Sequence, residues 1–459
     1  MKYLPLGIND ENKKVLNSVD EDTTANKIVK LEKILAAKGV GANLADEANK
    51  VFDPNVRWTY LVHEDDPHIN EYKEIIKPLA RHRGMRIPDV PLRFYGQCHE
   101  WRGWLKKHLE NIPMMMRPNY ILIVGDPEMI PFEFQSRLDV QANVGRVCFD
   151  TLEGLQTYVD KVVRLSNDPP LLEKKATFFA PNYGKNKNEE YDATYYSYNK
   201  MVKPMLDYIK KDLATLNIAT DPLAENNATK DRLVDNLTKS KSAFVYVASH
   251  GVGRAKGADR QKEVTGAIAC QDWNETPDDD SLFKGKDIPL DKKTPFLEGA
   301  VFVQFSCFSY GTPKYDEVVD LSSDESPARP IADKSLVADI PKKLLAHPRG
   351  PLAFIGHVNI AYLEGFYDDN DVLSEEDKIG LGPYNSIVDS VFNNQTMGTA
   401  MNTMNMRGAD DSRVLSDELP VYIKNPSAKK KLEINKLFLS KHDSVNYFLF
   451  GDPAVKLNL

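Results

Sequence analysis

Apolar residues along this chain form two kinds of pattern, short uninterrupted runs and longer stretches in which they recur every three or four positions. The uninterrupted runs are rich in β-branched and aromatic residues, which is typical of buried strands in a parallel sheet. We predict strands at 58–63, 120–124, 176–180, 243–248, 300–305 and 351–356, and the chain closes on a further apolar run at 447–450.

The periodic stretches predict amphipathic helices between these strands. They lie at 24–38, 69–83, 101–111, 151–166, 196–213, 230–239, 331–347 and 384–405. We expect Pro78 to interrupt the second of them, because proline lacks the backbone N–H that a helix interior needs. Strands that alternate with helices indicate an α/β fold, with a mostly parallel sheet and helices on both faces. The active site of such a sheet lies beyond the carboxyl ends of its strands.

Two of the predicted strands end in a small residue followed by a reactive side chain. Ser249 precedes His250, and Ser306 precedes Cys307, 57 positions further on (307 − 250). A cysteine beside a histidine is the minimal set of groups for nucleophilic catalysis by a thiolate. The pattern predicts a cysteine peptidase in which Cys307 attacks, with its pKa lowered by the imidazolium, and His250 transfers protons. The alternatives are a buried core cysteine and a structural histidine.

Composition narrows the class of protein. A length of 459 residues suggests two or three domains, and the contents of apolar and charged residues are those of a soluble globular protein. The net charge of −8 (59 − 67) argues against direct nucleic-acid binding or a membrane-surface protein. The four cysteines form no metal-ligand spacing, and sparse thiols suit a reducing compartment. The first residues lack an apolar signal core, so we expect a cytoplasmic protein without a cofactor or metal.

Three polar segments interrupt the alternation at 253–295, 315–330 and 368–378. Long connections inside a compact domain are usually functional or disordered. We expect these three to wall the site and to hold points of activation or self-cleavage.

At the two strand ends the chain resembles the gingipain family of cysteine peptidases, within the caspase-haemoglobinase clan. Its pattern is a strand ending in His-Gly and a later strand ending in a small residue and Cys, here His250-Gly251 and Ser306-Cys307. Further segments resemble the same family. They are YILIVGDPEMIP at 120–131, Gly145-Arg146, Pro348-Arg349-Gly350-Pro351 followed by LAFIG, and the closing FLFGDPAV. Parts of the pattern are also similar to CHAT peptidases, which are intracellular and often regulated by partners.

The resemblance implies endopeptidase activity on a protein substrate and two caspase-like subdomains. We expect an N-terminal extension at 1–50, a non-catalytic subdomain at 51–170 and a catalytic subdomain at 171–459. The family implies an oxyanion hole formed by the backbone N–H groups of Gly251 and the cysteine. It also places an acidic residue nearly sixty positions before its histidine, and of the residues in that window we choose Asp192 to orient His250; a helix N-cap is the alternative reading.

The chain departs from its relatives in two respects. We expect it to lack the secretion signal of gingipains, and Phe305 stands where the caspase motif has glutamine, so aspartate specificity is not carried over. A basic-residue specificity would need a pocket carboxylate, for which Asp272 is a candidate. We expect the pocket wall to include His357, Asn359 and Tyr362.

The sequence also allows other classes of function. A catalytically inactive caspase-like scaffold is the main alternative, although both reactive residues are intact. Acyl-transferring hydrolases and nucleotide binders are disfavoured, because the chain has no G-x-S-x-G elbow, no Walker loop and no G-x-G-x-x-G after a strand. A cytosolic endopeptidase must be restrained, so we expect an activating or inhibitory partner protein, or processing.

Overall fold

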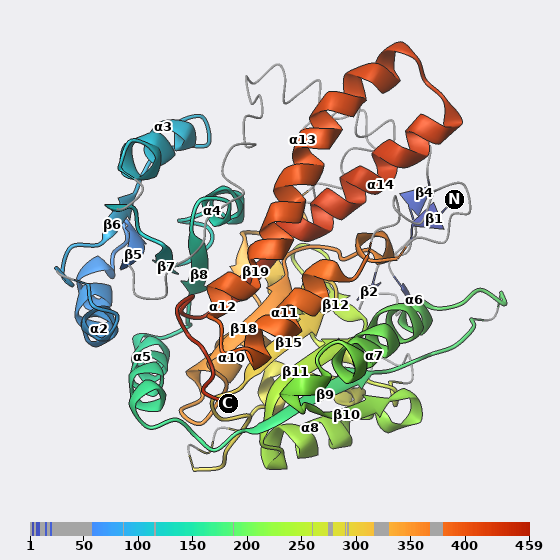
Figure 1. Cartoon of the computed structure of the whole chain (residues 1–459), viewed down its shortest axis with the longest axis horizontal. Helices are drawn as coiled ribbons and strands as arrows, with labels where there is room; N and C mark the ends of the chain where they lie inside the picture. The colour runs from blue at the N-terminus through green and yellow to red at the C-terminus, as the bar shows by residue number, and fades with distance from the viewer. Residues whose placement is uncertain are drawn as a thin grey trace.

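A ten-stranded sheet runs through the whole molecule (Figure 1). The computed structural model describes residues 2–3, 6–9, 14–15, 19–20, 57–85, 87–113, 116–186, 188–258, 260–273, 279–289, 291, 293–315, 330–367 and 380–459. From one edge to the other the strands are β10 (Ala219–Ala224), β9 (Glu173–Ala180), β11 (Ser242–Ala248), β15 (Val301–Phe305), β18 (Ala353–His357), β19 (Tyr447–Phe450), β8 (Asn143–Val147), β7 (Tyr120–Val124), β5 (Trp58–His63) and β6 (Leu92–Phe94).

Within this sheet every described pair of neighbours is parallel except β18 and β19. The predicted α/β class with a mostly parallel sheet is therefore confirmed. β19 comes from the end of the chain, yet it lies between β18 and β8, where Phe450 pairs with Arg146. The last strand thus joins the strands that precede residue 150 to those that follow it.

Helices cover both faces of the sheet (Figure 1). In the half formed by β5 to β8, Ile121 and Ile123 of β7 pack in one cluster with α3 (Trp101–Leu105) and α4 (Phe132–Asp139). Leu122 and Val124 belong to the opposite cluster, which contains α2 (Ile69–His82) and α5 (Leu152–Asn167). This alternation of side chains explains why β7 reads as a continuous apolar run, since both of its faces are buried.

The remaining helices follow the later strands. They are α6 (Ala193–Tyr196), α7 (Lys203–Lys211), α8 (Lys230–Lys239), α9 (Gln261–Val264), α10 (Asp339–Ala346), α11 (Gly382–Phe392), α12 (Met397–Ala400), α13 (Asn402–Lys424) and α14 (Ala428–Val445). α13 and α14 pack against each other as a helical hairpin that extends away from the sheet (Figure 1). No helix in the described ranges is long and apolar enough to cross a membrane.

Several predicted helices differ from the observed ones. α2 continues through Pro78, because this residue is exposed and water can reach the carbonyl group that loses its partner. The stretch at 331–347 is helical only from Asp339, since Leu336 and Val337 form β17 (Leu336–Val337), which pairs with β16 (Gly311–Thr312). The stretches at 101–111 and 196–213 each contain a π-helical segment, Lys106–Glu110 and Ser197–Val202.

The long helix predicted at 384–405 is wrong. α11 ends at Phe392, and Asn394 then adopts a φ of 56°, a left-handed conformation that breaks the helix. Thr396 caps the short α12, and α13 begins only at Asn402. The helix predicted at 24–38 lies outside the described residues.

A second, five-stranded sheet adjoins the carboxyl end of β11. Its order is β14 (Leu282–Phe283), β13 (Ile268–Ala269), β12 (Gly251–Gly253), β2 (Gly7–Asn9) and β3 (Lys14–Val15). The polar stretch at 253–295 thus contains β13, β14 and α9 rather than a plain loop. Residues 259, 274–278, 290 and 292 of this stretch lie outside the described residues. Residues 316–329 and 368–379 of the two other polar segments also lie outside them.

Candidate active site

β11 and β15 place His250 and Cys307 at equivalent positions on neighbouring strands. Ala248 pairs with Phe305 at the end of the parallel ladder, and each reactive residue follows two positions later. The N–H of Ser249 donates to the carbonyl oxygen of Phe305 at 3.2 Å, which extends the ladder to the residue before His250. Both side chains are fully buried. The carboxyl edge of the sheet therefore brings the two predicted residues together.

Asp192 contacts His250 directly, with both carboxylate oxygens 3.0 and 3.1 Å from Nε2. The same carboxylate caps α6 by accepting the N–H and the hydroxyl proton of Thr194. Asp192 is therefore both a helix N-cap and a hydrogen-bond partner of His250. Burial alone would raise the pKa of Asp192. The charge of His250 and the hydrogen bonds from His250 and Thr194 outweigh burial and lower that pKa to about 2.

This contact fixes the orientation of the imidazole. An ionised Asp192 accepts the proton on Nε2, so in the neutral ring Nδ1 carries the free lone pair. Within the described part of the chain Nδ1 has no hydrogen-bond partner. The ring also stacks on Tyr183, at 6.1 Å between ring centroids and 9° between planes. Nδ1 is thus left free to exchange a proton.

Two backbone N–H groups converge on one oxygen atom. Gly251 and Cys307 donate to the carbonyl oxygen of Leu6 at 3.1 and 3.0 Å. Gly251 must be glycine here, because a Cβ on it would lie 1.9 Å from the carbonyl oxygen of Cys307. Phe308 follows with a φ of 58°, a sharp turn directly after the strand. Paired N–H donors at about 3 Å are the geometry that stabilises an oxyanion.

The thiol of Cys307 lies against the segment that follows β18. The N–H of Ala361 is 3.2 Å from Sγ, and the carbonyl oxygen of Ala361 accepts from the N–H of Leu6 at 2.9 Å. Burial raises the pKa of this thiol well above its ordinary value, although the N–H of Ala361 works in the opposite direction. The predicted lowering of this pKa is therefore wrong in the structure, because the sulfur is fully buried and burial disfavours the thiolate.

The predicted pocket residues have different surroundings. Asp272 is exposed, and its carboxylate accepts the backbone N–H of Lys230 at the start of α8. Asn359, with a φ of 102°, accepts the N–H of Phe308 and thereby holds the turn after Cys307. Tyr362 is buried directly after Ala361.

His357 forms part of a second buried group with His442 and Asp443, whose ligand atoms all lie within 4.8 Å of one another. This is the one group in the described ranges with the composition of a metal site. Burial lowers the pKa of His357 to about 3 and that of His442 to about 4, and it raises the pKa of Asp443. Each histidine also bonds a backbone carbonyl, of Asn359 and Ile360 respectively. Burial thus disfavours the charged form of all three groups.

Leu6 and Ala361 were missed by the sequence reasoning. Both act through the backbone, and neither stands in a pattern of chemically active side chains. One signal for Ala361 was its position in the sequence. It follows β18, the neighbour of β15, and the chain after such a strand must pass the carboxyl edge of the sheet, where Cys307 lies.

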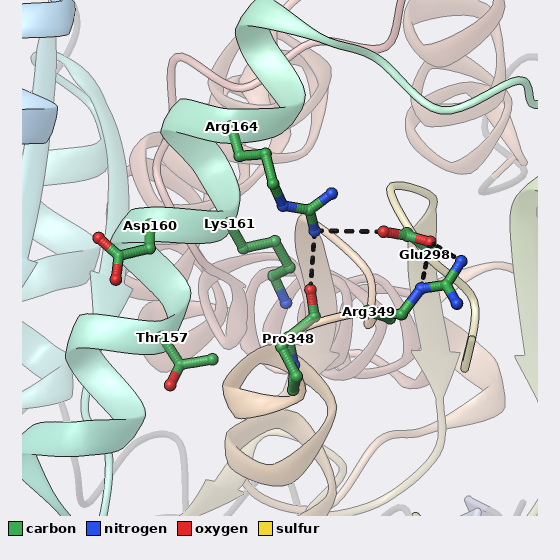
Figure 2. A pocket seen from close by; sticks show the side chains of 7 residues that line it. All are labelled: Thr157, Asp160, Lys161, Arg164, Glu298, Pro348 and Arg349. Carbon is green, nitrogen blue, oxygen red and sulfur yellow. Dashed lines mark hydrogen bonds and ion pairs between the residues drawn. The ribbon is translucent and has the colours of Figure 1, made fainter. Parts of the chain in front are cut away.

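An open cavity of about 520 Å³ lies elsewhere on the molecule (Figure 2). It is lined by α5 and by the loops that precede β15 and β18, at the opposite edge of the sheet from Cys307. Arg164 and Arg349 both pair with Glu298 there, and Arg164 also donates to the carbonyl oxygen of Pro348. Its charged groups thus connect α5 to the later strands, and neither Cys307 nor His250 lines it.

Comparison with known proteins agrees with this geometry. The family model described as "Peptidase family C25" matches residues 98–458. A solved structure entitled "Structure of Protease" is similar with a TM-score of 0.50 and 12% identity, over 88% of this chain and 79% of that chain, which shows likeness of fold. The separase–securin complex of Saccharomyces cerevisiae aligns at a TM-score of 0.34 and 11% identity, over 95% of this chain and 22% of that chain. A search of curated proteins finds no match.

The family match covers most of the chain and both strand ends that carry the reactive residues. It thereby confirms the resemblance inferred from those strand ends. This chain belongs to peptidase family C25, the gingipain family of the caspase-haemoglobinase clan, and is a cysteine peptidase.

Proposed function

We propose that this chain is an endopeptidase that cleaves a protein substrate through the dyad of Cys307 and His250. The observation that carries the proposal is the convergence of the Gly251 and Cys307 N–H groups on a single carbonyl oxygen beside the thiol. A substrate carbonyl in that position gains two hydrogen bonds as its oxygen becomes negative, which lowers the barrier to attack by sulfur.

The remaining groups have complementary roles in this proposal. His250 takes the thiol proton through Nδ1 and returns it to the leaving amine. Asp192 is the positioning residue, because it fixes the ring and stabilises the imidazolium that forms during attack. Asn359 keeps the turn after Cys307 in place. In this proposal residues 171–459 are the catalytic subdomain and residues 51–170 a non-catalytic caspase-like subdomain.

We place the activity in the cytoplasm, under the control of a partner protein or of processing. The sparse cysteines support a reducing compartment, since Cys98, Cys148, Cys270 and Cys307 are all unpaired. The buried thiol supports restraint, because a raised pKa leaves little thiolate. Full activity of the purified chain, without partner or processing, would count against this part of the proposal.

The test is the Cys307→Ala variant, with Cys270→Ala as the matched control. Both cysteines are fully buried and unpaired, but Cys270 lies beyond β13 and not at the nucleophile position. We expect wild type and Cys270→Ala to create new peptide termini in a protein mixture, detected by mass spectrometry. Cys307→Ala should create none, and cleavage that persists in that variant would refute the assignment. Absence of cleavage by wild type, with and without cell extract, would favour an inactive scaffold.

A further inference from the structure

Leu6 binds the backbone groups around the thiol in the way that a bound peptide would. Its carbonyl oxygen receives the N–H groups of Gly251 and Cys307, and its own N–H donates to the carbonyl oxygen of Ala361. All three backbone hydrogen bonds of this residue are thus made with the groups that surround the thiol. The Leu6–Gly7 peptide bond thereby stands where the reacting bond of a substrate is expected.

The chain on the far side of this bond is also held. Gly7–Asn9 (β2) lies parallel to Gly251–Gly253 (β12), with Gly7 opposite Gly251. Main-chain pairing of an extended segment with a strand edge is a general mode of peptide recognition. Residues on both sides of the Leu6–Gly7 bond are therefore bound through backbone contacts.

The side chain of Leu6 supplies the specific part of the contact. It is fully buried and belongs to the main hydrophobic cluster of the protein. The carboxyl group of Asp443 accepts the backbone N–H of Tyr362 and is therefore already engaged within the protein. Asp272 is exposed, and its carboxylate accepts the backbone N–H of Lys230. The surroundings favour an apolar residue over a basic one.

From these contacts, and resting on the proposed function, we propose that the site formed by Gly251, Cys307 and Ala361 binds substrates with a large aliphatic residue immediately before the scissile bond. Leu6 of the chain itself fills that place as an internal competitor. A tethered segment has an effective concentration of roughly millimolar order, so it excludes weak peptides and yields to a substrate with more contacts. This arrangement accounts for the buried thiol and gives the peptidase a restraint within its own N-terminal segment.

The first experiment measures occlusion in the full-length chain. We compare the rate at which iodoacetamide alkylates Cys307, by peptide mass mapping, in wild type, Leu6→Asp and Leu6→Met. Leu6→Asp should be alkylated at least about tenfold faster, since a carboxylate is expelled from an apolar site and the thiol opens to water. Leu6→Met should behave as wild type, because it is apolar and of similar volume.

Leu171→Asp is the control, because it makes the same exchange at a leucine that is 82% exposed. Circular dichroism and thermal unfolding check that each variant folds. Equal alkylation of Cys307 in folded wild type and Leu6→Asp would overturn the occlusion.

The second experiment measures specificity with three reporter peptides that carry Leu-Pro-Leu, Leu-Pro-Arg or Leu-Pro-Asp before the reporter. The first repeats the sequence of residues 4–6. We expect kcat/KM to be at least about tenfold higher for the leucine peptide. Cys307-dependent cleavage that prefers arginine or aspartate would overturn the inference and leave the proposed function intact. Cleavage that survives Cys307→Ala would refute the proposed function itself, while the alkylation result still decides whether Leu6 covers the thiol.

Discussion

The carboxylate of Asp192 lies 3.0 Å from Nε2 of His250, although 58 positions separate the two residues along the chain. Asp192 is the N-cap of α6, the first helix after β9, and His250 follows β11, which is the neighbour of β9 in the sheet. The parallel order of these strands therefore brings a helix cap to the histidine. One carboxylate serves both the start of a helix and the proposed catalytic ring.

These two roles can be separated by replacing Asp192. Asn and Ser are both good N-cap residues, so Asp192→Asn and Asp192→Ser should retain the cap on α6 while the charged partner of His250 is lost. We expect kcat to fall between about 10-fold and about 100-fold in both variants, because the imidazolium is no longer stabilised or oriented. Steady-state kinetics on a peptide substrate would measure this. A rise in KM with kcat unchanged would contradict the positioning role.

Acid should weaken the stabilising effect of Asp192. The pKa of Asp192 is about 2 in the folded protein and about 3.9 in an unfolded chain. The ionised carboxylate therefore stabilises the fold fully at pH values above the unfolded-state pKa. The contribution is roughly 2–3 kcal/mol, and it is lost as the pH falls through the folded pKa. Urea unfolding of wild type and Asp192→Asn should show a difference in free energy at about pH 6 that narrows towards about pH 2.5. A difference that stays constant over this range would argue against the linkage.

Gly251→Ala should abolish most activity without a general loss of fold. A Cβ on Gly251 would lie 1.9 Å from the carbonyl oxygen of Cys307, so the two strand ends must separate and their N–H groups can no longer converge. Loss of one oxyanion donor usually lowers kcat by about 100-fold to about 1,000-fold, and we expect a decrease in that range.

Gly103→Ala is the matched control for this exchange. Gly103 lies in α3 with no atom within 4 Å of an added Cβ, and alanine favours a helix. This variant should keep wild-type kcat/KM. Comparable losses in both variants would mean that the effect of Gly251→Ala is not local.

The sequence was sufficient to predict the residues whose side chains carry chemistry, and insufficient for those that act through the backbone. β11 and β15 are buried on both faces, so their apolar runs are continuous and the residues after them are easily located. Leu6 looks like any apolar residue, because its role depends on three main-chain hydrogen bonds. The predicted direction of the Cys307 pKa failed for a similar reason, since full burial of the thiol depends on tertiary packing and raises that pKa.

The helical hairpin shows a different limit of the sequence reasoning. α13 is mostly polar and buries only four of its residues, so the apolar periodicity that predicts helices is weak along it. The prediction therefore ended at residue 405, near the start of α13, and missed α14 altogether. In contrast, α8 was predicted with its observed bounds, because Leu233 and Leu237 face the core one turn apart.

The two Gly-Asp-Pro segments, which look alike in sequence, should differ in stability when their aspartates are replaced. Asp452 is fully buried and accepts hydrogen bonds from the indole of Trp58, in β5, and the guanidinium of Arg83, at the end of α2. Asp126 is partly exposed, and Lys334 lies 3.7 Å from its carboxylate. We expect Asp452→Ala to lower the free energy of unfolding by about 3–5 kcal/mol, because it leaves Arg83 without its buried partner.

Asp126→Ala is the control for this prediction and should lower the free energy of unfolding by less than about 1 kcal/mol. Its side chain makes a turn with the N–H of Glu128 and a weak surface ion pair, and neither is buried. Urea unfolding of the three proteins at neutral pH would measure both effects. If the two variants lost equal stability, the Asp452 network could not be what joins the last strand to the first half of the sheet.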